Sequence, residues 1–330
     1  MAVQAFILRR LANIIPLLIG ISFLSFSIMY LAPGDFLGEL RLNPQVSAET
    51  IEMMRAQYGL DRPFLVQYWM WFKEAFPLPG NWSVNLGRSF QFHTPVTTLI
   101  GFYAFNTFLL SVSSALLAWL IAIPIGIYAA RKQYSLGDKF LTTVAFMGVS
   151  IPNFFLGLII LYFVVRWDWP LPVGGATSLG YDELSLWGKI VDRAHHLIVP
   201  TLVLATGSTA GLMRYMRSNL LDTLRQDYVR TARAKGLSER LVVYKHGLRN
   251  AINPLITFFG FEIASLLSGA TLTEFVTSYP GLGRLLYGGL RANDYHLVLG
   301  GLMVGSFMLI VGNLIADILL AWADPRIRYQ

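Results

Sequence analysis

Long stretches of this chain carry no charged side chain, and that feature limits its possible folds more than any other. The longest uncharged runs are residues 11–34, 89–130, 140–165, 194–213, 251–261 and 295–316. Only 14% of all residues are charged and 55% are hydrophobic, whereas an ordinary soluble domain is about 25% charged. Most of the runs reach the roughly 20 residues that a helix needs to cross a bilayer.

We therefore predict an all-α integral membrane protein with six transmembrane helices. Their approximate limits are residues 6–31, 107–130, 140–165, 197–215, 251–273 and 297–321. Six such segments argue against a soluble protein with large buried helices. A cleaved signal peptide is the alternative for the first run, because Arg9 and Arg10 precede it, but the run is too long and lacks a small-residue cleavage site.

The distribution of basic residues predicts the orientation of these helices. If the N-terminus is cytoplasmic, the inside segments hold 16 of the 26 Lys and Arg residues and five acidic residues, a net charge of +11. The outside segments then carry −2. Since Lys and Arg accumulate on the cytoplasmic side, both termini are predicted to be cytoplasmic. The same asymmetry accounts for the basic composition without a nucleic-acid-binding surface.

The predicted helices divide the chain into four parts. Residues 1–32 form the cytoplasmic N-terminus and first helix, and residues 33–98 form an extracytoplasmic segment inserted before the second helix. Residues 99–322 form the transmembrane core, and residues 323–330 form a cytoplasmic tail. The inserted segment is far longer than a simple connection, so we expect it to fold on its own.

The extracytoplasmic segment contains one helix signal and a group of aromatic residues. Ser47 can cap a helix and Gly59 can end it, with apolar residues at helical spacing between them. The aromatic residues that follow are Trp69, Trp71, Phe72 and Trp82. They either anchor the chain at the membrane interface or touch a docked partner.

The most informative segment is residues 214–250, which we call the basic loop because it holds nine Lys and Arg residues. We predict a helix over residues 220–235, a left-handed residue at Gly236 and a second helix capped by Ser238. A long cytoplasmic loop with two short basic helices is suited to meet a partner protein. A basic helix lying on anionic lipid headgroups is the alternative.

Short motifs run along nearly the whole chain. Those of the basic loop and the residues after it are Asp227-Tyr228-Val229-Arg230-Thr231-Ala232-Arg233-Ala234-Lys235-Gly236-Leu237 and His246-Gly247-Leu248-Arg249-Asn250-Ala251-Ile252-Asn253-Pro254. Others are Leu86-Gly87-Arg88-Ser89, Thr273-Glu274, Tyr279-Pro280-Gly281, Asp294-Tyr295 and Asp324-Pro325-Arg326. In order and spacing they resemble the permeases of the dipeptide, oligopeptide and nickel family of ATP-binding-cassette (ABC) importers.

The resemblance implies a type I ABC importer permease fold and a docking role for the basic loop. In that family the equivalent "EAA" loop carries a short coupling helix that fits a groove on a cytoplasmic ATPase. The coupling residues carried over are Asp227, Tyr228, Arg230, Thr231, Ala232, Arg233, Ala234, Lys235, Gly236 and Leu237. Arg230-Thr231 stands where many ABC permeases have Glu-Ala, which looks like the peptide subfamily's own version.

The resemblance also implies which tasks fall to other subunits. The sequence has no G-x-x-x-x-G-K-[ST] motif, which ATPases use to hold phosphates. We therefore expect no catalytic residue, cofactor or metal on this chain, and ATP and Mg to be used by two partner ATPases. A second related permease and an extracytoplasmic substrate-binding protein complete the expected assembly, in a bacterial or archaeal inner membrane.

Polar residues inside the predicted helices are candidates for the translocation path. Glu262, in the predicted fifth helix, either attracts a peptide's amino terminus or makes a buried structural contact. Asn106 and Asn153 are further candidates for the path. Asp317, near the end of the sixth helix, suits a structural contact.

Two other classes of membrane protein fit the sequence less well. A secondary transporter usually has an inverted repeat and ion-coupled carboxylates, and this chain shows neither pattern. A membrane enzyme could use His195 and His196, but adjacent helical side chains point about 100° apart. The substrate stays open among dipeptides, longer peptides, nickel chelates and sugars.

Overall fold

The structure is a computed structural model that describes residues 2–31, 37–41, 45–57, 59–76, 84–256, 258–259 and 270–323. Within these ranges the chain is helical, and the β structure consists of an isolated bridge between Arg88 and Pro95. Four helices are long and apolar enough to cross a membrane: α1 Ala2–Leu31, α5 Val96–Arg131, α8 Leu186–Leu224 and α15 Tyr295–Ala323.

A fifth span is present if two bent helices are counted together, namely α6 Leu136–Ser150 and α7 Asn153–Arg166. These helices agree with five of the six predicted spans. The middle of the remaining one, residues 251–273, lies outside the described residues.

The third predicted span, residues 140–165, is broken rather than straight. The axes of α6 and α7 meet at 100°. Ile151 has φ −93° and ψ 121°, because a residue that precedes proline is pushed out of the helical region. Pro152 also lacks the N–H that a continuing helix would need, so the chain turns and α7 begins.

Two of the predicted spans are longer than hydropathy indicates. α5 begins at Val96 and α8 at Leu186, in both cases about ten residues before the predicted start. Ser185 caps α8 by accepting a hydrogen bond from the Gly188 amide at 3.2 Å. Hydropathy detects the part of a helix that lies in hydrocarbon, whereas the hydrogen-bonded helix continues until a capping residue ends it.

The chain divides into two compact units. One takes in Val3–Asn106 and Gly281–Met308, and the other takes in Thr107–Pro280 and the chain from Leu309 on. Helices α5 and α15 each contribute residues to both units.

In the first unit, short helices follow α1: α2 Leu37–Arg41, α3 Ala48–Gln57 and α4 Phe64–Ala75. Ser47 caps α3, as predicted, by accepting a hydrogen bond from the Thr50 amide at 3.1 Å. Helix α4 packs on α1 through aromatic rings, including Tyr68 and Trp71 against Phe26. Trp71 is buried in this contact, whereas Trp69 is 50% exposed.

Two of the sequence motifs meet in the first unit. Ser89 donates a hydrogen bond to the Asp294 carboxylate at 2.5 Å, and the Gln91 amide donates to the same oxygen at 3.1 Å. The other oxygen of Asp294 accepts from the Leu297 amide at 3.1 Å and so caps α15. Asp294 is fully buried. The loop before α5 is thereby fixed to the start of α15, after α14 Leu282–Arg291.

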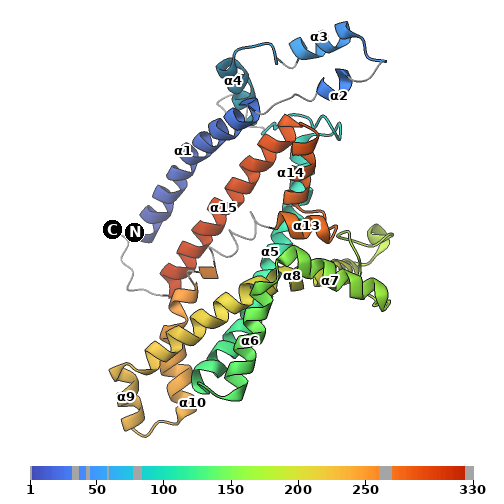
Figure 1. The fold of residues 1–330 in the computed structure, drawn as a ribbon. Coiled ribbons are helices and arrows are strands. Elements are labelled where there is room, and N and C mark those ends of the chain that lie inside the picture. The colour runs from blue at the N-terminus through green and yellow to red at the C-terminus, as the bar shows by residue number, and fades with distance from the viewer. Residues whose placement is uncertain are drawn as a thin grey trace. The chain divides into compact units, whose positions relative to one another are not determined.

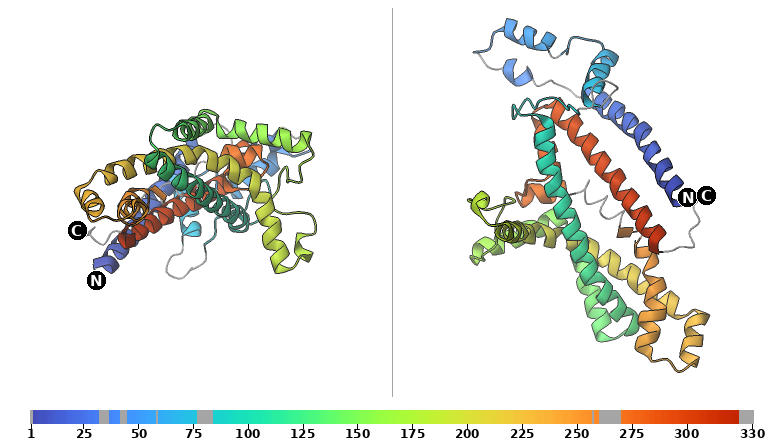
Figure 2. Two further views of the ribbon diagram at one scale, coloured as in Figure 1. Left: turned by 90° about the horizontal axis from the view of Figure 1, so that it is seen from below. Right: turned by 180° about the vertical axis from the view of Figure 1, so that it is seen from behind.

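The second unit is built around α8. Helices α6 and α7 both pack along α8, and Gly126 of α5 lies close to Met213 and Met216 of the same helix. Figures 1 and 2 show α9 and α10 beyond the end of α8, on the side of the unit where α6 begins. Short helix α13 Thr271–Val276 packs on α7 and α8.

We predict that Gly87→Ala destabilises the first unit. Gly87 has φ +83°, and an added Cβ would lie 2.5 Å from Nδ1 of His296. Backbone strain and overlap of this kind together cost about 2 kcal/mol or more, which should lower the thermal unfolding midpoint of the detergent-purified protein. The matched control is Gly101→Ala in α5, where nothing lies within 4 Å of an added Cβ. Equal midpoints for the two variants would contradict this account.

Candidate functional site

The basic loop contains more and shorter helices than predicted. α8 runs to Leu224, and α9 spans Asp227–Ala234. Gln226 between them is extended, with φ −70° and ψ 151°. The single helix predicted over residues 220–235 is therefore wrong, because helix-forming residues on both sides of Gln226 gave no signal of the break.

After α9 the chain continues through three short elements: α10 Glu239–Leu241, a π-helical turn Val242–Gly247 and α11 Leu248–Ala251. Ser238 lies at the N-cap position of α10, as predicted, but its side chain makes no capping hydrogen bond. This return segment provides the surface on which α9 packs.

Gly236 ends α9 in the predicted left-handed conformation, with φ +75°. The Gly236 amide donates to the Arg233 carbonyl at 2.9 Å, and the Leu237 amide donates to the Ala232 carbonyl at 3.4 Å. These two bonds form the Schellman motif, which satisfies the last carbonyl groups of a helix. An added Cβ at Gly236 would meet nothing within 4 Å, so only the backbone conformation requires glycine here.

Helix α9 has a buried face and an exposed face. Val229 and Ala232 are buried against Val242, and Leu224 and Leu237 pack around them. The predicted coupling residue Ala232 therefore faces inward. The coupling residues with exposed side chains are Asp227, Tyr228, Arg230, Thr231, Arg233, Ala234 and Lys235. The outer face of α9 is thus polar and basic, and it is held by an apolar inner face.

Arg233 joins three segments of the loop. Its Nε and Nη2 atoms donate to the two carboxylate oxygens of Glu239 at 3.1 and 2.8 Å, and Nη1 donates to the Leu224 carbonyl at 3.4 Å. α9 is thereby tied to α10 and to the end of α8. Such a two-point pair is among the stronger side-chain contacts, although 42% and 55% of the two side chains are exposed.

The pair with Arg233 sets the charge state of Glu239. Hydrogen bonds from the guanidinium hold the pKa of this carboxyl below its ordinary value. A lowered pKa means that the pair stabilises the loop above the pKa of the unfolded chain, about 4.3, and that the contribution is lost as pH falls through the lower folded value. At neutral pH the Arg233–Glu239 pair is therefore fully charged.

Arg230 differs from Arg233 in its surroundings. It lies 3.4 Å from Asp227, and 71% and 95% of the two side chains are exposed. Tyr228 beside it accepts a hydrogen bond from the Asn250 side chain at 2.7 Å. The sequence could not separate these roles, because Glu239 and Asn250 lie six and 22 residues from their partners.

The candidate path residues are not brought together within one unit. Asn106 is fully buried in the first unit. Asn153 begins α7 in the second unit and lies against Gly207 of α8, where an added Cβ would be 2.8 Å from its Oδ1. Glu262 lies outside the described residues.

One buried carboxylate was not among the residues predicted from the sequence. Glu274 of α13 is fully buried, and Thr107 of α5 donates a hydrogen bond to its Oε1 at 2.7 Å. The motif Thr273-Glu274 was visible in the sequence. Because Glu274 is charged, however, it was assigned to the loop after the predicted fifth helix. His195 and His196 instead bond to the carbonyls of Pro170 and Asp192, at 2.7 and 2.9 Å, as expected of structural histidines.

We predict that the Arg233–Glu239 pair stiffens α9. Arg233→Gln and Glu239→Gln should each speed hydrogen exchange of the α9 amides by up to about fivefold, since an exposed ion pair contributes about 1 kcal/mol or less. The double variant should exchange no faster than either single variant. Arg230→Gln is the matched control, and it should leave the exchange unchanged. Additive effects of the two single variants would show that the pair does not act as a unit.

Nearly the whole chain matches two known protein families. Residues 122–329 match the family described as binding-protein-dependent transport system inner membrane component. Residues 3–110 match the N-terminal family of the same membrane components. The two matches together include the basic loop and the segment of residues 33–98.

Curated relatives match the chain from end to end. The oligopeptide transport system permease protein AppB of Bacillus subtilis (strain 168) is 43% identical over 326 residues, which cover 98% of this chain and 99% of that protein. The dipeptide transport system permease protein DppB of Escherichia coli (strain K12) is 36% identical over 348 residues, with 98% and 99% covered.

A solved structure shares the fold. The inward-facing MetNI methionine ABC transporter aligns with a TM-score of 0.54 and 16% identity, covering 69% of this chain and 97% of that one. At this identity the likeness concerns the fold alone. It confirms the expected type I importer permease architecture.

Proposed function

Because this chain belongs to the inner membrane components of binding-protein-dependent transport systems, we propose that it forms one transmembrane half of an ABC importer for peptides. Peptides are favoured as the substrate class because the relatives that match from end to end are named for oligopeptides and dipeptides. The proposed mechanism rests on the structure of α9, which is an amphipathic helix. Its apolar face packs on Val242, and its exposed face is polar.

In this proposal, α9 is the coupling helix that docks on a cytoplasmic ATPase. A coupling helix transmits motion only if it is stiffly joined to a membrane span. α9 meets that condition through two contacts with the end of α8. Arg233 donates a hydrogen bond to the Leu224 carbonyl. The Leu224 side chain also packs against the buried residues Val229 and Ala232 of α9. Movement of the docked ATPase would then tilt the 39-residue helix α8 as a rigid body.

The remaining parts of the importer are separate subunits. Two ATPases would bind and hydrolyse ATP with Mg, a second permease would complete the path, and an extracytoplasmic binding protein would deliver the peptide. Within this chain, Arg230, Tyr228 and Lys235 are the exposed groups proposed to contact the ATPase. Ala232 and Gly236 would act by shaping the helix, and Asn106, Asn153 and Glu262 remain proposals for the path.

We predict that Arg230→Glu separates the permease from its ATPases. Losing an interface arginine costs on the order of 2 kcal/mol, so co-purification of the ATPases and peptide uptake should both fall about tenfold or more. The structure of the loop should be retained, since Arg230 bonds only weakly to exposed Asp227. Arg55→Glu, an equal charge reversal on exposed helix α3, should keep the ATPases bound. Full association and uptake by Arg230→Glu would contradict the coupling role.

The proposed orientation can be tested because the chain has no cysteine of its own. We expect a membrane-impermeant maleimide to label Leu179→Cys in intact cells, and to label Arg240→Cys only after the membrane is opened. Both positions are exposed, so access to the reagent decides the result. The opposite labelling pattern would overturn the assignment of cytoplasmic termini.

A further inference from the structure

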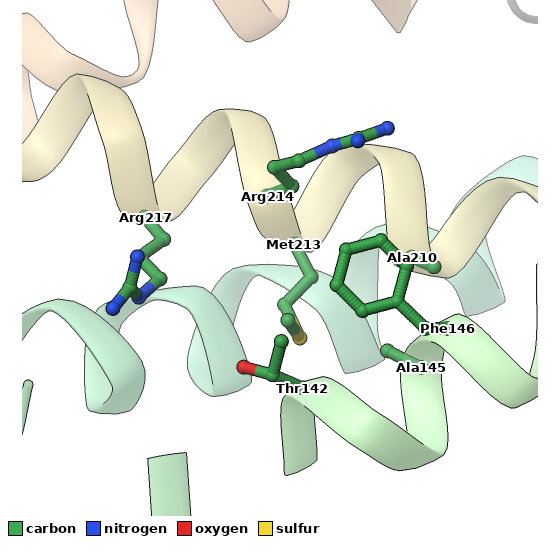
Figure 3. Close-up of a pocket in the computed structure, with 7 residues that line it drawn as sticks. All are labelled: Thr142, Ala145, Phe146, Ala210, Met213, Arg214 and Arg217. Atoms are coloured by element: carbon green, nitrogen blue, oxygen red, sulfur yellow. The ribbon is translucent and has the colours of Figure 1, made fainter. Parts of the chain in front are cut away.

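A pocket of about 110 Å³ lies between α6 and the second half of α8. Its wall includes Thr142 of α6 and Met213 and Arg217 of α8, and Figure 3 shows Met213 reaching toward Thr142 with Arg217 further along α8. Beside the pocket, exposed Arg214 lies 5.6 Å from the centre of the Phe146 ring, a contact that is weak at exposed sites. Close packing between the two helices is therefore interrupted here, because atoms around an unfilled space lack partners on one side.

Beyond one side of the pocket, the end of α6 is in close contact with α8. An added Cβ at Gly148 would lie 2.9 Å from Cγ2 of Thr206, so the two helices approach each other there as closely as a glycine allows. Gly148 is near the end of α6, just before the chain bends at Pro152. This contact fixes one end of α6 to α8.

At the other end of α6, an ion pair joins the two helices. Nη2 of Arg217 donates a hydrogen bond to Oδ2 of Asp138 at 3.1 Å, and 28% and 5% of the two side chains are exposed. Hydrogen bonds between charged groups are roughly twice as strong as neutral ones. Asp138 is ten residues before Gly148, about 15 Å along the helix at 1.5 Å per residue. α6 is therefore held to α8 at two separated points.

Asp138 also fixes the turn that joins α6 to α5. Its Oδ2 accepts a hydrogen bond from the Tyr134 amide at 2.9 Å, and its Oδ1 accepts one from Thr142 at 3.3 Å. Tyr134 has φ +65°, a left-handed conformation that is uncommon for residues other than glycine. Asp138 is buried, and these bonds make it a fixed point to which Arg217 ties α8.

The end of α5 is joined to α8 in a different way. Ile127 and Ala130 of α5 are buried in one apolar cluster with Met216 and Leu220 of α8. α5 is therefore attached to this part of α8 by apolar packing. The start of α6 lies beside the pocket instead, and its attachment depends on Asp138.

We propose that Asp138 and Arg217 are positioning residues that make α6 follow α8 during transport. This inference rests on the proposed function, in which a docked ATPase tilts α8. Arg217 is seven residues before Leu224, about 10 Å along the helix, and Leu224 is where Arg233 of α9 bonds to α8. Without the pair, α6 would be held close to α8 mainly at Gly148. It would then lag when α8 tilts, and the path would open incompletely while the ATPases continue to work.

The first test compares peptide uptake with ATP hydrolysis by the complete importer in proteoliposomes. In Asp138→Asn and in Arg217→Gln, the ATPases should still co-purify and hydrolyse ATP, because neither residue belongs to α9. Uptake per ATP should fall about fivefold or more, as expected when a hydrogen bond between charged groups is lost. This ratio does not depend on how much protein folds, so a merely structural role would leave it unchanged.

Two further variants sharpen this test. Arg217→Lys keeps a cation that can donate to Asp138 and should retain most of the wild-type ratio. Lys139→Gln is the matched control, because it removes one charge from an exposed residue beside Asp138 and should leave the ratio unchanged. Unchanged ratios in both Asp138→Asn and Arg217→Gln would overturn the proposal, as would an equal loss in Lys139→Gln.

The second test follows the two helices directly and keeps the pair intact. Because the chain has no cysteine, nitroxide labels can be placed at Leu136→Cys in α6 and Ser218→Cys in α8, both exposed. The distance between the labels, measured by pulsed electron paramagnetic resonance, should be the same with and without trapped ATP. It should change with ATP once Asp138→Asn is added.

A distance that already changes while the pair is intact would overturn the proposal, even if the substituted proteins fail to fold. A wild type that binds no ATPases would refute the importer function, and the positioning role with it. An active wild type with unchanged variants would refute the positioning role alone, so the two failures are distinguishable.

Discussion

The hydrocarbon interior of a bilayer gives a polar group no water to bond with, so buried polar groups need partners inside the protein. Backbone groups meet this requirement within α1, α5, α8 and α15. Buried carboxylates meet it through contacts between distant segments: Thr107 bonds to Glu274, and Ser89 bonds to Asp294. Each contact fixes a loop or short helix to a long one, so the demand for partners also determines which segments meet.

The basic loop is stabilised differently, because much of it is exposed. Its short helices bury little apolar surface, and helices of this length are marginal on their own. Three local devices compensate: the Schellman end at Gly236, the contact of Val229 and Ala232 with Val242, and the Arg233–Glu239 pair. Together they let eight residues of α9 keep one shape while presenting a polar surface.

Hydropathy and local sequence signals predicted much of this architecture. The existence of the long helices, the cap at Ser47 and the left-handed Gly236 are local properties of the sequence and were predicted correctly, although α5 and α8 begin about ten residues before their predicted starts. The bend at Pro152 and the break at Gln226 were not predicted, although the proline and the helix-forming residues around Gln226 are visible in the sequence. A proline shows where a helix can break but not by what angle, and Gln226 turns because Val229 and Ala232 pack on Val242, thirteen and ten residues further along.

The separate roles of the site residues could not be predicted from the sequence either. A motif places Arg230 and Arg233 side by side as equal candidates, since both are basic and helical. Their difference arises from Glu239 and the Leu224 carbonyl, which only the folded loop brings to Arg233. Contacts between residues on separate elements are set by packing, and a single sequence carries no direct record of them.

The nine basic residues of the loop therefore do not serve one purpose. Arg233 holds the loop together, Arg230 is exposed on α9, and Arg214 and Arg217 line a pocket between α8 and α6. The prediction of orientation treats these four arginines alike, because it depends only on the total number of Lys and Arg residues on each side of the membrane. Once the fold is formed, each arginine is distinguished by its neighbours: the Glu239 carboxylate for Arg233, solvent for Arg230, the Phe146 ring for Arg214 and the Asp138 carboxylate for Arg217. The basic residues from which the orientation is predicted thus also include one that stiffens the loop, Arg233, and one that is exposed on α9, Arg230.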